Sequence, residues 1–145
     1  MERHVLSTIH NEFSTIFQHW FSILIEETLT ARLDEQFTPL ITQNGYDTDV
    51  AHLSGGERTA CALAFRLALC KTVNSLIRTI TTKDILILDE PTDGFSSEQL
   101  DKMRDVLLSL GLSQIILVSH EQKIEGMADS IIRVRKENSV SSVVL

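Results

Sequence analysis

The residues of this sequence that most clearly predict chemistry are Ser54, Gly55, Gly56 and Glu57, which open a long apolar segment. Ser54 and Glu57 fit Ser-x-x-Glu, the capping box in which each side chain satisfies a backbone donor at a helix start. Helix formation alone does not favour the two glycines, because each costs roughly 1 kcal/mol against alanine. Without side chains they leave the backbone N–H groups accessible, and such a helix terminus favours an anion, most naturally phosphate. The alternative is an ordinary capped helix whose glycines only allow a tight turn.

A second group of polar residues follows two aliphatic segments. Asp89 and Glu90 come directly after Ile85–Leu88, and His120 follows Ile115–Val118. A carboxylate that ends a buried strand is well placed to hold Mg²⁺ at phosphates, and a second carboxylate beside it can accept a proton from an attacking water. We assign these roles to Asp89 and Glu90, and expect His120 to donate a hydrogen bond to the terminal phosphate. Each group taken singly is equally explained as a solvated strand end or a surface histidine, but their order along the chain argues against coincidence.

The segments that carry these residues predict an α/β fold. Ile85–Leu88 and Ile115–Val118 are typical of buried parallel strands covered on both faces. The amphipathic stretch Ser97–Leu110 between them predicts the helix of a strand-helix-strand unit. Ligands of such sheets bind at the carboxyl ends of the strands. A further helix, from Gly56 to about Ile80, is rich in small residues and is expected inside the layered domain.

Two shorter antiparallel elements flank this unit. Asn44 and Gly45 predict the turn of a hairpin within Phe37–Val50. Near the C-terminus, Ser130–Val134 and Val140–Leu145 alternate like an antiparallel pair.

The N-terminal region, from about His4 to Glu35, reads as one long helix with a heptad-like apolar seam. Its apolar band is wide and aromatic, so part of it should pack on the protein body and part could be an exposed docking face. Ordinary core is an equal alternative. A helix that starts abruptly at Met1 without a cap suggests a truncated domain or one half of a split domain. The aromatic residues of the candidate docking face are Phe13, Phe17, Trp20 and Phe21.

Length and composition set broad limits. The chain has 145 residues, 43% hydrophobic and 23% charged, as in one soluble globular domain. No apolar run approaches the roughly eighteen residues of a membrane span, and no signal peptide is evident. Cys61 and Cys70 belong to no zinc-binding pattern and are expected to be buried thiols. The net charge of −7 argues against a nucleic-acid surface over the whole chain, so any DNA contact should be local or shared with a partner.

Four segments resemble, in order, the motifs of ABC-type ATPases. Leu53–Glu57 resembles the signature motif, Ile85–Thr92 the Walker B segment, Asp93–Ser96 the D-loop and Val118–His120 the H-loop. Together they cover about the last two thirds of the chain. The signature continues as Gly-Gly-Glu-Arg and a coiled-coil-like helix precedes it, so the sequence most resembles the Rad-fifty family of DNA double-strand-break repair ATPases and their SMC relatives.

The resemblance implies an α/β fold that forms the C-terminal lobe of an ABC-type ATPase head, with a mostly parallel sheet flanked by helices. Residues 1–36 would form a coiled-coil-base helix and residues 37–145 the C-terminal half of the head. No Gly-x-x-x-x-Gly-Lys-Ser/Thr occurs in the sequence. The phosphate-binding Walker A loop would therefore lie in a separate N-terminal half, without which this chain should bind ATP poorly.

The resemblance also implies the roles of individual residues. Two completed heads would sandwich two ATP molecules as an ATP-dependent homodimer that hydrolyses ATP. Asp89 with Mg²⁺, Glu90 and His120 would act on the nucleotide of their own head. Residues 54–57 (Ser54, Gly55, Gly56 and Glu57) would contact the nucleotide of the other head. Ser96 stands where the D-loop aspartate is usual, so Asp93 or Ser96 would supply that contact.

The implied partners are an Mre-eleven type nuclease, placed at the aromatic residues of the N-terminal helix, and DNA in the full complex. No membrane contact is expected, and the location would be intracellular: cytoplasmic in a prokaryote or nuclear in a eukaryote. Two alternatives stay open. One is the ATPase half of another SMC-like chromosome-organising or recombination protein without a nuclease. The other is a non-catalytic module whose motifs persist as a dimer surface.

Overall fold

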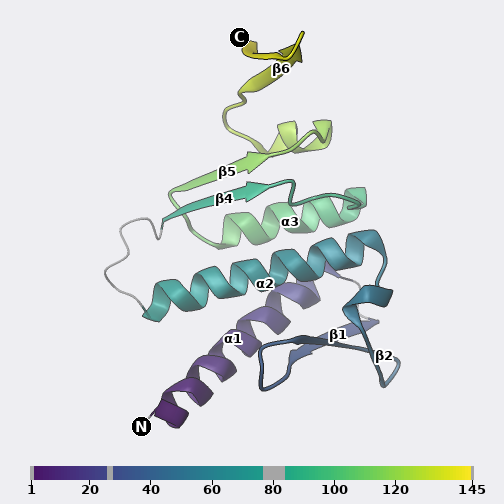
Figure 1. Ribbon diagram of the computed structural model, residues 1–145, viewed down its shortest axis with the longest axis vertical. Coiled ribbons are helices and arrows are strands. Elements are labelled where there is room, and N and C mark those ends of the chain that lie inside the picture. The colour runs from purple at the N-terminus through teal and green to yellow at the C-terminus, as the bar shows by residue number, and fades with distance from the viewer. Residues whose placement is uncertain (1, 26–27, 77–83, 145) are drawn as a thin grey trace.

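The computed structural model describes residues 2–25, 28–76 and 84–144, and its elements form layers stacked along the long axis of the molecule (Figure 1). Helix α2 crosses the middle, with α3 and the strands β4 and β5 on one side and α1 with the β1–β2 pair on the other. The elements are α1 (Glu2–Leu24), β1 (Leu29–Leu33), β2 (Pro39–Gln43), β3 (Tyr46–Thr48), η1 (Val50–His52), α2 (Gly55–Leu76), β4 (Ile85–Asp89), α3 (Ser97–Ser109), β5 (Gln114–Val118), η2 (Gln122–Met127), β6 (Arg133–Glu137) and β7 (Val140–Val144).

The strand-helix-strand unit is confirmed. β4 and β5 pair in parallel, from Ile85 opposite Gln114 to Asp89 opposite Val118, with α3 as the connecting helix. The expectation that both faces of this pair are covered was wrong for this chain. Side chains alternate along β4, so that Leu88 is buried while Ile87 is 65% exposed. One face of the parallel pair therefore carries apolar side chains that nothing in the described structure covers.

The single long helix predicted from His4 to Glu35 was wrong in its second part. Helix α1 ends at Leu24, and Leu29–Leu33 forms β1, which pairs antiparallel with β2. The reason is a change of period, because the buried Leu29, Ala31 and Leu33 alternate with exposed residues as a strand requires. The division of the chain at residue 36 stays a prediction, although β1 and β2 pair across it.

The predicted hairpin turn at Asn44 and Gly45 is confirmed. Both residues have positive φ, 51° and 84°, as a two-residue hairpin turn requires. The turn joins β2 to β3, and the register from Ile41 opposite Thr48 to Gln43 opposite Tyr46 completes a three-stranded antiparallel sheet. The C-terminal antiparallel pair is also present as β6 and β7, but its first strand spans Arg133–Glu137 instead of the predicted Ser130–Val134. Every residue of both strands is exposed.

The aromatic residues of α1 form the core rather than an exposed docking face. Phe13, Phe17, Trp20 and Phe21 are each at most 4% exposed. The ring of Phe65 on α2 lies 5.0 Å from that of Phe13 and 5.9 Å from that of Phe17. The proposed nuclease contact at these four residues was therefore wrong. Burying such a side chain stabilises the fold by about 1.5–3 kcal/mol, which favours the core over solvent.

The buried side of α2 includes several small residues. Ala60, Ala64 and Ala68 are completely buried, and such side chains let large aromatic rings approach a neighbouring helix. Cys61 is buried as predicted, and this burial raises the pKa of its thiol to about 11; Cys70 is only half-buried. Among the described helices, none is long and apolar enough to cross a bilayer.

Candidate functional site

The predicted capping box at the start of α2 is formed. The backbone N–H of Ser54 donates to the Glu57 carboxylate at 2.7 Å, and the N–H of Glu57 donates to the Ser54 hydroxyl at 3.3 Å. The N–H of Arg58 donates to the Ser54 carbonyl at 2.9 Å, which begins the regular helix. The side chains of Ser54 and Glu57 therefore fix the helix start, while the Ser54 hydroxyl keeps its own proton to donate elsewhere.

The two glycines of this turn have different surroundings. A Cβ atom added to Gly55 would meet nothing within 4 Å, so a ligand can approach its backbone. A Cβ atom added to Gly56 would lie 2.6 Å from the carbonyl oxygen of Gly94 and 2.9 Å from Oε1 of Gln99. Gly56 therefore has a second reason to be glycine, which is its close packing against the D-loop segment. The expectation that both glycines expose the backbone to an anion stays a prediction.

The D-loop segment is anchored to the first turn of α3. The Ser96 hydroxyl accepts the N–H of Gln99 at 3.2 Å, and the N–H of Ser96 donates to Oε1 of Gln99 at 3.0 Å. Gly94, with φ 76°, has the conformation that places its carbonyl against Gly56. Sequence reasoning missed the part played by Gly94 and Gln99. Ser96-x-x-Gln99 was nevertheless readable as a second capping box.

Glu90 and His120 come together at the carboxyl ends of β4 and β5. Nδ1 of His120 lies 2.9 Å from Oε2 of Glu90, and the N–H of Glu90 donates to the Val118 carbonyl at 2.8 Å. Glu90 has φ 46°, a left-handed conformation that is uncommon outside glycine and is enriched at functional sites. The strand pairing therefore places the candidate proton acceptor and the candidate hydrogen-bond donor in direct contact.

The surroundings of His120 favour its protonated form. The hydrogen bond to the Glu90 carboxylate, and then the negative charge of Glu90, raise the pKa of His120 above its usual value. Desolvation opposes this shift, and the charges of Glu121 and Asp93 add smaller contributions. Asp93 is thus electrostatically linked to the Glu90–His120 pair.

The candidate residues form two contacting groups. The turn of Ser54 and Glu57 reaches the D-loop segment through the close approach of Gly56 to Gly94, and Glu90 contacts His120. In the sequence, Glu90 stands four residues before Gly94. All of these groups follow strand ends or precede helix starts, where backbone donors and polar side chains are available to a ligand. The assignment of catalytic and nucleotide-binding roles to them stays a prediction.

Asp89, the candidate ligand of Mg²⁺, is exposed at the last position of β4. Within residues 2–25, 28–76 and 84–144, no three or more His, Cys, Asp or Glu side chains gather in a way that could hold a metal. Mg²⁺ usually binds through one or two carboxylates together with substrate phosphates and water. A single carboxylate at this position therefore fits a Mg²⁺ ion that arrives with a nucleotide, rather than one resident in the chain.

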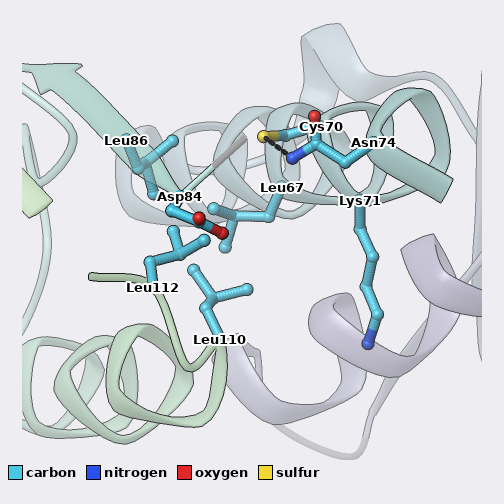
Figure 2. A pocket seen from close by; sticks show the side chains of 8 residues that line it. All are labelled: Leu67, Cys70, Lys71, Asn74, Asp84, Leu86, Leu110 and Leu112. Carbon is cyan, nitrogen blue, oxygen red and sulfur yellow. Dashed lines mark hydrogen bonds between the residues drawn. The ribbon is translucent and has the colours of Figure 1, made fainter. Parts of the chain in front are cut away.

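A cavity of about 250 Å³ lies at the other end of β4 (Figure 2). Its lining includes Asp84 and Leu86 at the start of β4, Leu110 and Leu112 after α3, and Cys70 on α2. Because Asp89 and Glu90 follow the opposite end of the strand, this mostly apolar cavity is separate from the candidate site.

Comparison with curated proteins finds relatives in several archaea, and all of these relatives have the same protein name. The chain is 36% identical over 139 residues to the DNA double-strand break repair Rad50 ATPase of Pyrococcus abyssi, covering 92% of this chain and 15% of that protein. It is 39% identical over 104 residues to the Rad50 ATPase of Sulfolobus acidocaldarius, covering 70% of this chain and 11% of that protein. The chain thus spans well under a fifth of the length of these relatives. No protein-family model matches it.

Solved structures with the same fold are SMC heads. One, from a study of ATP-driven dimerisation of SMC ATPases, superposes with a TM-score of 0.74 at 22% identity and covers 99% of this chain and 88% of that one. The SMC head domain of Thermotoga maritima superposes with a TM-score of 0.63 at 23% identity, covering 97% of this chain and 51% of that one. These similarities show the fold of an SMC-type head lobe, as the sequence motifs predicted. By sequence, the chain belongs to the Rad50 family of ATPases.

Proposed function

We propose that this chain is the C-terminal half of a split ABC-type ATPase head, and that it takes part in ATP hydrolysis once an N-terminal half completes the head and two heads dimerise. The observation that carries this proposal is the contact of Glu90 with His120 at the carboxyl edge of the parallel pair. The helix start at Ser54 is joined to the same region through Gly56 and Gly94. A site that hydrolyses a nucleotide can use a proton acceptor, a hydrogen-bond donor and an anion-binding helix start together.

Two further observations support a split head. The sequence lacks the Gly-x-x-x-x-Gly-Lys-Ser/Thr loop that cradles phosphates. One face of the parallel pair is also open, with Ile87 65%, Ile116 40% and Val118 51% exposed. A two-stranded sheet is marginal by itself, and an apolar face of this kind is normally covered. The half that carries the loop is the proposed cover.

Each polar residue of the candidate site would have a separate role in ATP hydrolysis. Glu90 would accept a proton from the attacking water. His120 uses Nδ1 toward Glu90, which leaves Nε2 for a phosphate oxygen, and the raised pKa favours the imidazolium in which Nε2 carries a proton. Ser54 would donate its hydroxyl proton, beside the open backbone of Gly55, to the nucleotide of the opposite head. Mg²⁺, held through Asp89, would neutralise charge on the phosphates.

The wider setting follows from the relatives. Because they are named DNA double-strand break repair ATPases, we propose an intracellular role in that process, with DNA and a nuclease as partners. The buried aromatic residues of α1 no longer identify where a nuclease would bind. The ATP-driven dimerisation described for an SMC ATPase supports a head dimer, in which Asp93 or Ser96 would supply the D-loop contact.

The test is binding of this chain to a purified N-terminal half that carries the phosphate loop. Ile87→Glu should abolish formation of the complex, because it places a charge in the open apolar face. The control, Leu108→Glu, changes a residue of α3 with similar exposure, 69%, and should leave complex formation intact. Equal binding by the two variants would contradict the proposed cover. In the completed head, Glu90→Gln should trap ATP-bound dimers; unchanged turnover would refute the role of Glu90.

A further inference from the structure

The turn at the start of α2, residues 54–57, packs directly on the D-loop segment, residues 93–96, and we call it the signature turn. A Cβ atom added to Gly94 would lie 3.2 Å from the backbone nitrogen of Gly56 and 3.3 Å from the carbonyl carbon of Gly55. Because the added Cβ of Gly56 would likewise meet the Gly94 carbonyl oxygen at 2.6 Å, the two backbones contact each other without intervening side chains. Such close packing resists compression. It does not by itself stop the two segments from separating.

The side chain of Gln99 contacts both segments. Its Oε1 accepts the N–H of Ser96 at 3.0 Å, and the same oxygen lies 2.9 Å from the position of a Cβ atom added to Gly56. In glycine a hydrogen atom takes the place of Cβ, so a Cα–H group of Gly56 points toward this oxygen. The side chain is half-buried, and the backbone N–H of Gln99 donates to the Ser96 hydroxyl at 3.2 Å. One fixed oxygen therefore joins the end of the D-loop segment to the signature turn.

Both segments continue into helices that are anchored in the core. Leu100, in the first turn of α3, is 3% exposed, and its N–H donates to the Ser96 carbonyl at 3.0 Å. Ala60, in the second turn of α2, is completely buried. With the two helix starts held in this way, Gln99 bridges the place where α2 and α3 begin.

We propose that Gln99 is a positioning residue that makes the signature turn and the D-loop segment one rigid unit. The inference rests on the proposed function, in which both segments face the other head of the dimer. When one segment docks on that head, the Gln99 contact places the other, so the two engage together. Gln99 acts through Ser96 and Gly56 and needs no contact with nucleotide.

The first test measures amide hydrogen exchange by NMR in this chain alone. The N–H groups of Glu57 and Arg58 report on the signature turn, because they donate to the hydroxyl and the carbonyl of Ser54. Gln99→Ala should accelerate exchange at both amides at least about fivefold more than at Leu67. Leu67 is 1% exposed in the middle of α2 and reports global unfolding.

Two further variants separate this link from a general loosening of α3. Glu98→Ala removes the ion pair with Lys102, 2.9 Å long, from the same turn of α3, and it should leave exchange in the signature turn at the wild-type rate. Gln99→Glu keeps an oxygen for the N–H of Ser96, as in the common form of the capping box, and should restore slow exchange.

The second test uses the head completed by the half that carries the phosphate loop. Gln99→Ala should raise the head concentration that gives half-maximal ATP turnover at least about fivefold, because a misplaced D-loop segment weakens the meeting of two heads. ATP affinity, measured by equilibrium dialysis far below that concentration, should be unchanged. A variant that was merely unstable would instead lower maximal turnover.

Wild-type exchange rates at Glu57 and Arg58 in Gln99→Ala would overturn the rigid link. Equal loosening by Glu98→Ala, or no restoration by Gln99→Glu, would do the same. Faster exchange combined with an unchanged head concentration for half-maximal turnover would overturn the role in dimerisation. If the completed wild-type head hydrolyses no ATP, the proposed function fails and the role in dimerisation fails with it, whereas hydrogen exchange in this chain alone still decides whether Gln99 links the two segments.

Discussion

The clearest structural contrast between neighbouring residues is that between Gly55 and Gly56, and it predicts opposite effects of the same substitution. Gly55→Ala adds a methyl group in open space, so it should gain up to about 1 kcal/mol of stability from helix propensity. Gly56→Ala places its Cβ atom 2.6 Å from the Gly94 carbonyl oxygen and 2.9 Å from Oε1 of Gln99. Moving Gln99 would break the capping box at Ser96, and the Gly94 oxygen belongs to the backbone.

Overpacking of this kind costs about 1–3 kcal/mol, which exceeds the gain in helix propensity. Gly56→Ala should therefore lower the free energy of unfolding by up to about 2 kcal/mol, and it should be less stable than Gly55→Ala by about 1–3 kcal/mol. Both lose the same freedom in the unfolded chain, so their comparison isolates the folded-state contact. Urea unfolding followed by circular dichroism measures the difference. Equal stability of the two variants, or a more stable Gly56→Ala, would refute the close packing of Gly56 on Gly94.

Three further predictions follow. Phe17→Ala should lower the free energy of unfolding by about 3–5 kcal/mol in urea titrations, because this ring is completely buried; a loss below 1 kcal/mol would indicate an exposed face instead. In NMR titrations the pKa of His120 should lie above its usual value and fall in Glu90→Gln. Because the pKa of His120 is raised in the folded state, the Glu90–His120 pair stabilises the fold fully at a pH below the usual histidine pKa. This stabilisation disappears as the pH rises through the raised pKa. An unchanged pKa of His120 in Glu90→Gln would exclude the pairing. Iodoacetamide at pH 8 should modify Cys70 well before Cys61, since a pKa of about 11 leaves only about one Cys61 thiol in a thousand ionised; equal rates by mass spectrometry would contradict its burial.

Features set by short-range patterns could be predicted from the sequence. The capping box at Ser54, the turn at Asn44 and the strands that precede Asp89 and His120 each depend on a few neighbouring residues. The contact between Glu90 and His120 could be anticipated only in general terms, since parallel strands bring their carboxyl ends to one edge.

Features set by tertiary packing could not be predicted in this way. The aromatic band of α1 has the same helical spacing whether it faces solvent or α2, and only the packing of Phe13 and Phe17 on Phe65 decides between these. The close approach of Gly56 to Gly94 joins segments that lie far apart in the sequence. The apolar run of β4 predicted a strand buried on both faces, whereas in the described structure only one face of the strand is buried.

The most direct test of the split-head account is steady-state ATP turnover by this chain alone, by the N-terminal half that carries the phosphate loop, and by their mixture. The account predicts turnover only in the mixture, rising steeply with head concentration because two heads must meet, and lost in Glu90→Gln. Turnover by this chain alone would contradict it, since the chain would then bind and hydrolyse ATP without the phosphate loop. A mixture that forms a stable complex yet hydrolyses no ATP would contradict the catalytic assignment of Glu90 and His120.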